Sequence, residues 1–153
     1  MGRDVAKQLI LRGYRVILTS RSEQKGSQAY AQLQHELGST LPGELVYHPL
    51  DVTDAQSISR LHSFVVSQYQ AADVLVNNAA ILLDPYGRIL HTSVDIFRSS
   101  METNAFGPLL LCQTFIPQMV ERNYGRVVNV SSGAGQVENM IDDMTAYRLS
   151  KIA

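Results

Sequence analysis

Two residues near the end of the chain, Tyr147 and Lys151, are spaced so that they could perform acid–base chemistry together. Residues four apart on a helix lie on the same face, one turn from each other. A tyrosine hydroxyl has an ordinary pKa of about 10, which is too high for an efficient base near neutral pH. The ammonium of Lys151 would favour the phenolate and lower that pKa. The pair is therefore suited to acid–base chemistry through Tyr147, although this spacing is common and each residue alone is more often an ordinary surface residue.

Three further polar residues stand near predicted strand ends or on a helix that borders them. Asn78 follows the apolar run 73–76, and Ser132 follows the run 126–130. Asn104 lies within an apolar helix pattern, where a buried amide needs hydrogen-bond partners. A serine hydroxyl can donate a hydrogen bond to a substrate oxygen on which charge develops. Each residue alone is more often an ordinary surface, loop or structural residue, so only their joint occurrence points to catalysis.

The elements that must position these residues alternate between helix and strand. Apolar residues at steps of three and four predict helices over 2–12, 23–37, a stretch capped by Asp54, 94–123, and a stretch from Thr145 onward. Short apolar runs predict strands at 14–19, 45–48, 73–76 and 126–130, with a turn over 38–43 and a loop over 131–144. Pro108 and Pro117 predict a kink or break in the long helix. This alternation predicts an α/β fold, with a parallel sheet and helices on both faces.

Composition excludes several classes of protein. Thirteen basic and fourteen acidic residues give a formal net charge of −1, so no basic excess points to nucleic acid or to a membrane surface. The single Cys112 excludes an intrachain disulfide, and with four scattered histidines it excludes a Cys-rich zinc site. No apolar run approaches the roughly 20 residues that span a bilayer, and the N-terminus does not resemble a signal peptide. We therefore expect one cytoplasmic domain over residues 1–153, without a metal centre.

Taken together, four motifs resemble the short-chain dehydrogenase/reductase family, in its shorter, non-extended branch. They are Asn77-Asn78-Ala79-Ala80, Asn104-Ala-Phe-Gly107, Ser132 with Gly135 three residues later, and Tyr147-x-x-x-Lys151. The resemblance covers essentially the whole chain, and the stretches 101–107 and 125–132 are most similar to carbonyl-reductase-like members. It implies a doubly wound, Rossmann-type sheet and an oxidoreductase that transfers a hydride between NADP(H) and a small carbonyl or alcohol substrate.

The resemblance also implies a role for each motif residue. Tyr147 would be the general acid when a carbonyl is reduced and the base when an alcohol is oxidised. Ser132 would donate a hydrogen bond to the substrate oxygen, and Asn104 would hold a water that links Lys151 to solvent. The implied catalytic set is Asn104, Ser132, Tyr147 and Lys151. The implied cofactor-binding set is Gly2, Arg21, Asp51 and Val52 (these last two at the adenine), Asn78, Ala79 and Ala80 (at the ribose nearer the nicotinamide), and again Tyr147 and Lys151.

Arg21 predicts NADP rather than NAD as the cofactor. It directly follows the first predicted strand, and no carboxylate precedes Glu23 there. An NAD-selective site would present Asp or Glu near that strand end to bind the ribose 2′-hydroxyl. A guanidinium suits the 2′-phosphate of NADP instead. The alternative is an exposed arginine on a loop between a strand and a helix.

Two features depart from the family pattern. Ala80 replaces the usual glycine, and only Gly2 is present of the glycine-rich loop that cradles the pyrophosphate. The family also has a strand before that loop and further strands after the position of Lys151, and we find neither in these 153 residues. We therefore expect an incomplete domain, truncated at both ends, whose 153 residues are inactive by themselves and marginally stable. The alternative function is a non-catalytic fragment that keeps the motifs.

Family members often associate through the long helix and the Tyr/Lys helix, so a homodimer or homotetramer of the full-length protein is a further expectation.

Overall fold

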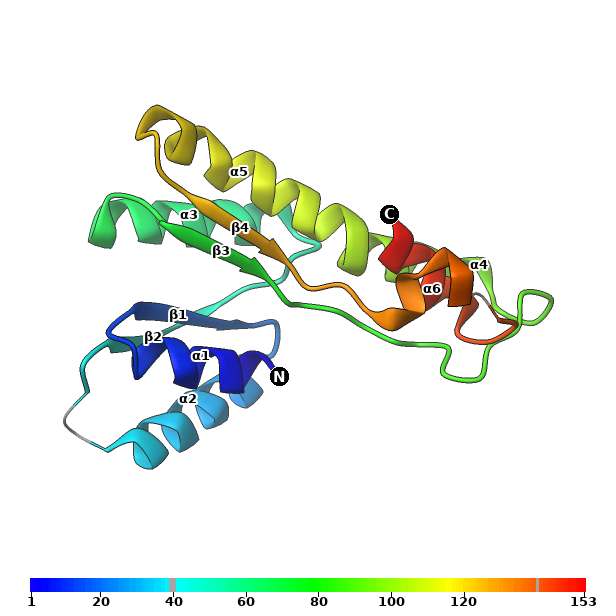
Figure 1. Ribbon diagram of the computed structural model, residues 1–153, viewed down its shortest axis with the longest axis horizontal. Helices are drawn as coiled ribbons and strands as arrows, with labels where there is room; N and C mark the ends of the chain where they lie inside the picture. Colours follow the sequence, from blue (N-terminus) through cyan, green and yellow to red (C-terminus); the bar gives the residue numbers. More distant parts are fainter. Residues whose placement is uncertain (39–40, 140) are drawn as a thin grey trace. The chain divides into compact units, whose positions relative to one another are not determined.

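The computed structural model describes residues 1–38, 41–139 and 141–153, which form two compact units, Met1–Asp51 and Val52–Ala153 (Figure 1). We call them the first unit and the second unit. The turn predicted over 38–43 and the loop predicted over 131–144 fall in part outside the described residues, at 39–40 and at 140.

The first unit is a parallel strand pair covered by two helices. Its elements are α1 (Gly2–Ile10), β1 (Arg15–Ser20), α2 (Glu23–Leu37) and β2 (Glu44–Pro49), and β1 pairs with β2 in parallel. The Ser22 hydroxyl caps α2 by accepting a hydrogen bond from the backbone N–H of Lys25, as the sequence predicts. The core between helices and strands is apolar, and its buried members are Ala6, Ile10, Leu33 and Leu45.

The second unit repeats this parallel pairing with more helices. Its elements are α3 (Ala55–Tyr69), β3 (Val74–Asn77), α4 (Val94–Met101), η1 (Glu102–Phe106), α5 (Gly107–Glu121), β4 (Arg126–Asn129), η2 (Gly133–Gly135), η3 (Val137–Asn139) and α6 (Thr145–Ile152). Strands β3 and β4 pair in parallel, and α5 packs against both of them and against α3 (Figure 1). The Asp54 carboxylate caps α3 by accepting from Gln56 N at 2.9 Å. The buried apolar side chains between α3 and α5 include Leu61, Val65, Phe115 and Met119.

The α/β prediction is confirmed, because helices and strands alternate and both strand pairs are parallel. Each predicted helix and strand is present, and most ends differ by only one or two residues. In the part of the chain that the structure describes, the four strands form two separate two-stranded sheets. No helix in these described ranges combines the length and the apolar character that crossing a lipid bilayer requires.

The long helix predicted over 94–123 is interrupted, as the prolines suggest. A π-helical turn, η1, separates α4 from α5, and Pro108 is the second residue of α5. Proline has no N–H, so the carbonyl of Asn104 cannot receive its α-helical hydrogen bond from position 108. Pro117 lies inside α5 without ending it. Such π turns within helices are frequently found at functional sites.

We expect Gly107→Ala to destabilise the second unit. Helix propensity favours alanine by about 1 kcal/mol, but overpacking costs about 1–3 kcal/mol. A Cβ at Gly107 would lie 2.8 Å from Val52 Cγ2 and 3.0 Å from the Val52 carbonyl oxygen, so the steric cost should exceed the propensity gain. Thermal unfolding measures the effect, with Gly133→Ala as the control, because a Cβ at Gly133 meets nothing within 4 Å. Equal melting temperatures for the two variants would contradict this expectation.

Candidate active site

The carboxyl ends of β3 and β4 lie at one edge of the second unit, because the strands are parallel and Asn77 is opposite Asn129. Asn77 Nδ2 donates to Asn129 Oδ1 at 2.8 Å, and Val130 N donates to the carbonyl of Asn77 at 2.9 Å. The segments that leave this edge carry Asn78 and Ser132. The two residues selected from strand ends in the sequence therefore follow neighbouring strands at the same edge.

The side chain of Asn104 connects this edge to α6. Its Nδ2 donates to the carbonyl of Ile81 at 2.9 Å and to Ser150 Oγ at 2.8 Å. Its Oδ1 accepts from Ile81 N at 2.8 Å. Asn104 is 7% exposed, and both ends of its amide are hydrogen-bonded. The amide thus fixes the loop after β3, the π turn η1 and α6 to one another.

Ser132 directly precedes η2 and caps its N-terminus. Its Oγ accepts a hydrogen bond from Ala134 N at 3.2 Å. A hydroxyl oxygen that accepts a hydrogen bond keeps its own hydrogen for donation. The η2 turn also lies directly against α6, since a Cβ on Gly135 would come within 2.6 Å of the Lys151 carbonyl oxygen. The structure therefore brings the segment of Ser132 against the helix of Tyr147 and Lys151.

Helix α6 carries Tyr147 and Lys151 one turn apart, as the spacing predicts. Lys151 Nζ donates to the carbonyl of Val130 at 2.9 Å, which holds the ammonium at the carboxyl end of β4. An ammonium has three hydrogens to donate, and Val130 takes one of them. Ser150 Oγ, which accepts from Asn104, donates in turn to the carbonyl of Tyr147 at 2.8 Å.

Burial lowers the pKa of the Lys151 ammonium below its ordinary value of 10.5, because desolvation disfavours the charged form. A lysine with a lowered pKa releases its proton more readily. Perturbed pKa values cluster at functional sites, so Lys151 is a candidate member of such a site.

Three of the predicted cofactor residues belong to the first unit. Gly2 is the first residue of α1, and Arg21 is exposed between the end of β1 and Ser22. Asp51 is half-buried shortly after β2. Arg21 and Asp51 therefore follow the carboxyl ends of the two strands of this unit, the usual side for ligands in parallel sheets.

The other predicted cofactor residues lie in the second unit. Val52 is buried, while Ala79 and Ala80 are exposed on the segment that leaves β3. The Oδ1 atom of Asn78 is buried and has no hydrogen-bond partner among residues 1–38, 41–139 and 141–153. An acceptor without a protein partner, next to two exposed residues, is compatible with the hydroxyl donors of the ribose that the family resemblance implies here.

Sequence reasoning missed two contributors to this site. Asp84 is 5% exposed, and its carboxylate accepts from the backbone N–H groups of Ala146 and Tyr147 at 2.7 and 3.4 Å. Ile81 supplies both backbone partners of Asn104. Both residues lie in the irregular stretch 79–91, where no periodicity marks a role. The only sequence signal is the Asp-Pro-x-Gly order of 84–87, which is typical of a tight turn.

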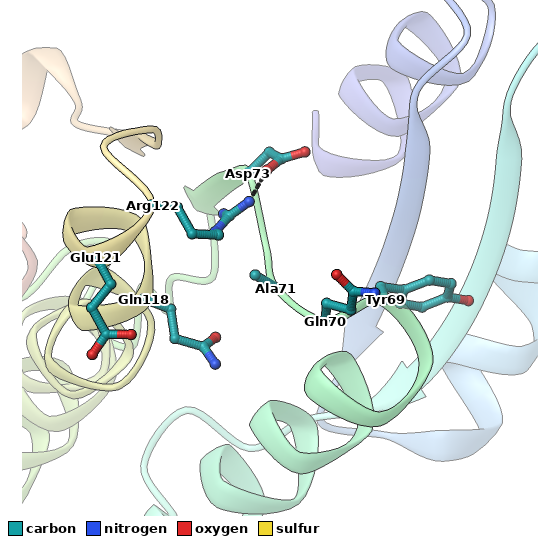
Figure 2. A pocket seen from close by; sticks show the side chains of 7 residues that line it. All are labelled: Tyr69, Gln70, Ala71, Asp73, Gln118, Glu121 and Arg122. Atoms are coloured by element: carbon teal, nitrogen blue, oxygen red, sulfur yellow. Dashed lines mark hydrogen bonds and ion pairs between the residues drawn. The ribbon is translucent and has the colours of Figure 1, made fainter.

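A polar pocket of about 180 Å³ lies elsewhere in the second unit (Figure 2). Its lining includes Asp73, directly before β3, and Arg122, directly after α5, which form an ion pair at 2.8 Å. Gln118 and Glu121 on α5 and the end of α3 at Tyr69 also line it. The pocket is at the start of β3, and none of the predicted site residues lines it. It is therefore distinct from the edge that carries Asn104, Ser132 and Lys151.

Comparison with known proteins gives a consistent result. The profile of the family described as short chain dehydrogenase matches residues 1–153. The chain is 33% identical to (+)-neomenthol dehydrogenase of Arabidopsis thaliana over 98% of its own length and 56% of that protein. It is 40% identical to carbonyl reductase [NADPH] 1 of Bos taurus over 76% of its own length and 39% of that protein. The chain thus spans about half the length of the curated relatives it matches.

A solved structure with the same arrangement is a metagenomic short-chain oxidoreductase in complex with NADP. The two chains superpose with a TM-score of 0.84 at 29% sequence identity. The match covers 98% of this chain and 64% of the other.

We expect Lys151→Met to become less stable relative to the parent protein as the pH rises toward 10.5. At neutral pH the buried ammonium carries its full desolvation cost. The native state releases this proton before the unfolded state does, so the parent gains stability as the pH passes through the lowered pKa. The variant lacks that gain. Melting temperatures from pH 7 upward measure the difference, with Lys25→Met, at an exposed position, as the control. Parallel pH curves for the parent and Lys151→Met would contradict the assignment.

Proposed function

Because this chain belongs to the short-chain dehydrogenase family, we propose that it transfers a hydride between NADP(H) and a small carbonyl or alcohol substrate. Tyr147 is the general acid or base of this reaction. One observation carries the proposal: α6, with Tyr147 and Lys151, is fixed at the carboxyl edge of β3 and β4 by the bond from Lys151 Nζ to the Val130 carbonyl. Ligands of parallel α/β sheets bind beyond that edge.

The proton chemistry follows from three side chains. Tyr147 gives its phenolic proton to the substrate oxygen in reduction and takes a proton from it in oxidation. The positive charge of Lys151 favours the phenolate that forms in reduction. Ser132 donates a hydrogen bond to the same substrate oxygen, where negative charge develops. A preorganised donor is effective there because its oxygen already accepts from Ala134 N and needs no reorientation.

In proton supply, we propose that Asn104 acts through its backbone carbonyl and not through its side chain. Its side-chain amide is engaged by Ile81 and Ser150. Its carbonyl cannot take an α-helical bond from position 108, because that residue is proline. We propose that this carbonyl holds the water through which Lys151 exchanges its proton with solvent.

When bound, a nicotinamide would supply the hydride for reduction and would accept it in oxidation. Asn78, Ala79 and Ala80 would hold its ribose through the buried Asn78 Oδ1 and the exposed backbone. Asp51 and Val52 would lie at the adenine, Gly2 at the pyrophosphate, and Arg21 at the 2′-phosphate. Support for NADP comes from Arg21 and from a relative and a solved structure whose names carry NADPH and NADP.

A second candidate is a polypeptide that keeps the motifs without catalysis. It is favoured by apolar strand side chains that are exposed in the second unit, those of Val74, Val127 and Val128. Such partly exposed side chains forgo only a part of the about 1.5–3 kcal/mol that full burial of a side chain contributes. An activity that depends on the Tyr147 hydroxyl separates the two candidates.

Replacing Tyr147 with phenylalanine in the complete gene product should lower kcat for NADPH-dependent carbonyl reduction about 10²–10⁴-fold. The ring stays, and only the proton donor is lost, so NADPH binding should persist. NADPH consumption with a panel of ketones and aldehydes measures kcat. The control is Tyr124→Phe, which removes a hydroxyl from an exposed tyrosine. A kcat in Tyr147→Phe equal to that of the control would reject the acid–base role.

Arg21→Asp should weaken NADPH binding by about tenfold or more and leave NADH binding little changed. Hydrogen bonds to charged groups contribute about 1.5–3 kcal/mol, and 1.4 kcal/mol is a factor of ten in affinity. The carboxylate would also repel the 2′-phosphate. Titration of cofactor fluorescence measures both affinities, and Arg12→Asp makes the same charge change at another exposed arginine of the first unit. Equal NADPH affinity in the two variants would show that Arg21 does not contact the phosphate.

A further inference from the structure

The carboxylate of Asp84 is buried against the first turn of α6. Its Oδ2 accepts from Ala146 N at 2.7 Å, and its Oδ1 accepts from Tyr147 N at 3.4 Å. These are the second and third residues of the helix, the positions whose N–H groups a capping side chain normally binds. Asp84 thus caps a helix that begins more than 60 residues later in the chain, and it binds the backbone of Tyr147 itself.

Helix α6 has no cap of its own. The residue before it, Met144, has a left-handed backbone with φ 44° and ψ 37°, and its side chain makes no capping hydrogen bond. The first N–H groups of a helix have no partner within the helix, and buried ones are costly if left unpaired. The remote carboxylate also places a negative charge at the positive end of the helix dipole. Asp84 therefore supplies what the local sequence lacks.

A tight turn presents this carboxylate. Gly87 N donates to the Asp84 carbonyl at 2.9 Å and closes the turn Asp84-Pro85-Tyr86-Gly87. Proline in the second position and glycine in the fourth are typical of such turns. The Gly87 carbonyl accepts from both Thr145 N, at 3.3 Å, and Thr145 Oγ1, at 3.1 Å. The turn therefore binds the first three residues of α6 through two of its own residues, Asp84 and Gly87.

The turn leaves no room for a side chain at its fourth position. A Cβ on Gly87 would come within 2.6 Å of Asp84 Cβ and 2.7 Å of Thr92 Oγ1. The backbone of Gly87 therefore lies close against the Asp84 side chain, and only glycine fits at this position of the turn.

We infer that Asp84 is a positioning residue for Tyr147, which it places for proton transfer by capping α6 from the loop after β3. The inference rests on the proposed role of Tyr147. Asp84 touches the backbone of Tyr147 and acts on the reaction through it. Loss of the cap lets the first turn of α6 fray and moves the phenol away from its working position, while cofactor binding at the strand ends persists.

The test compares Asp84→Ala, Asp84→Asn and the parent in the complete gene product, with kcat, KM and NADPH affinity measured for each. Asp84→Ala should lower kcat at least about tenfold, because misplacement by about 1 Å can cost about 10²-fold in rate. NADPH affinity should stay that of the parent. Asp84→Asn, which retains an acceptor oxygen at the same distance, should recover most of kcat. The control is Asp142→Ala, which removes an exposed carboxylate paired with Arg88 and should leave kcat unchanged.

Parent-like kcat in Asp84→Ala, or an equal loss in Asp84→Ala and Asp84→Asn, would overturn the inference. If Asp84→Ala does not fold, Asp84→Asn is compared with Asp84→Glu, which keeps the charge but displaces it by one methylene. The inference requires the asparagine variant to keep the higher kcat, and the reverse order overturns it. A parent protein without turnover would contradict the proposed function instead. Hydrogen exchange at the Ala146 and Tyr147 amides tests the cap itself, since equal protection in the parent and in Asp84→Ala would show that Asp84 forms no cap.

Discussion

A buried amide must find hydrogen-bond partners, and the way Asn104 does so determines how the candidate active site is assembled. Leaving such a group unpaired costs about 1–3 kcal/mol, a large share of the 5–15 kcal/mol that stabilises a domain. Asn104 avoids this cost by binding the backbone of Ile81 at two points and the hydroxyl of Ser150 at a third. The loop after β3 and helix α6 therefore cannot shift independently of the π turn. Ser150 transmits the constraint to the carbonyl of Tyr147.

The position of Asn104 depends in turn on a defect in the helix that carries it. An uninterrupted α-helix from Val94 to Glu121 would require an N–H at Pro108, which proline does not have. The chain forms the π turn Glu102–Phe106 just before this point, and Gly107 then brings the start of α5 against Val52. Pro108 thus disfavours a regular α-helix at this place, and the π turn that forms instead presents Asn104 to the loop after β3 and to α6.

The sequence was sufficient for features that depend on neighbours along the chain. The caps at Ser22 and Asp54, the strands and the spacing of Tyr147 and Lys151 all follow from local rules, and the structure agrees with each. It was insufficient where partners are remote. The prolines predicted that the long helix would be disturbed, but not that a π turn would form there. Asp84 lies in a stretch without periodicity, and Met144 gives no cap signal, so their connection through α6 could be seen only in three dimensions.

The interactions of helix α6 with three other segments explain how Tyr147, the proposed acid or base, is positioned. The positive, N-terminal end of the helix meets the Asp84 carboxylate, which has the sign that the helix dipole favours there. One turn after Tyr147, the ammonium of Lys151 binds the Val130 carbonyl. Tyr147 lies between these two attachment points, and Ser150 adds a third through Asn104. The backbone of Tyr147 is thus held at its N–H by Asp84 and at its carbonyl by Ser150. A backbone fixed in this way restricts where the phenol can lie, and such restriction favours acid–base catalysis if Tyr147 acts as proposed.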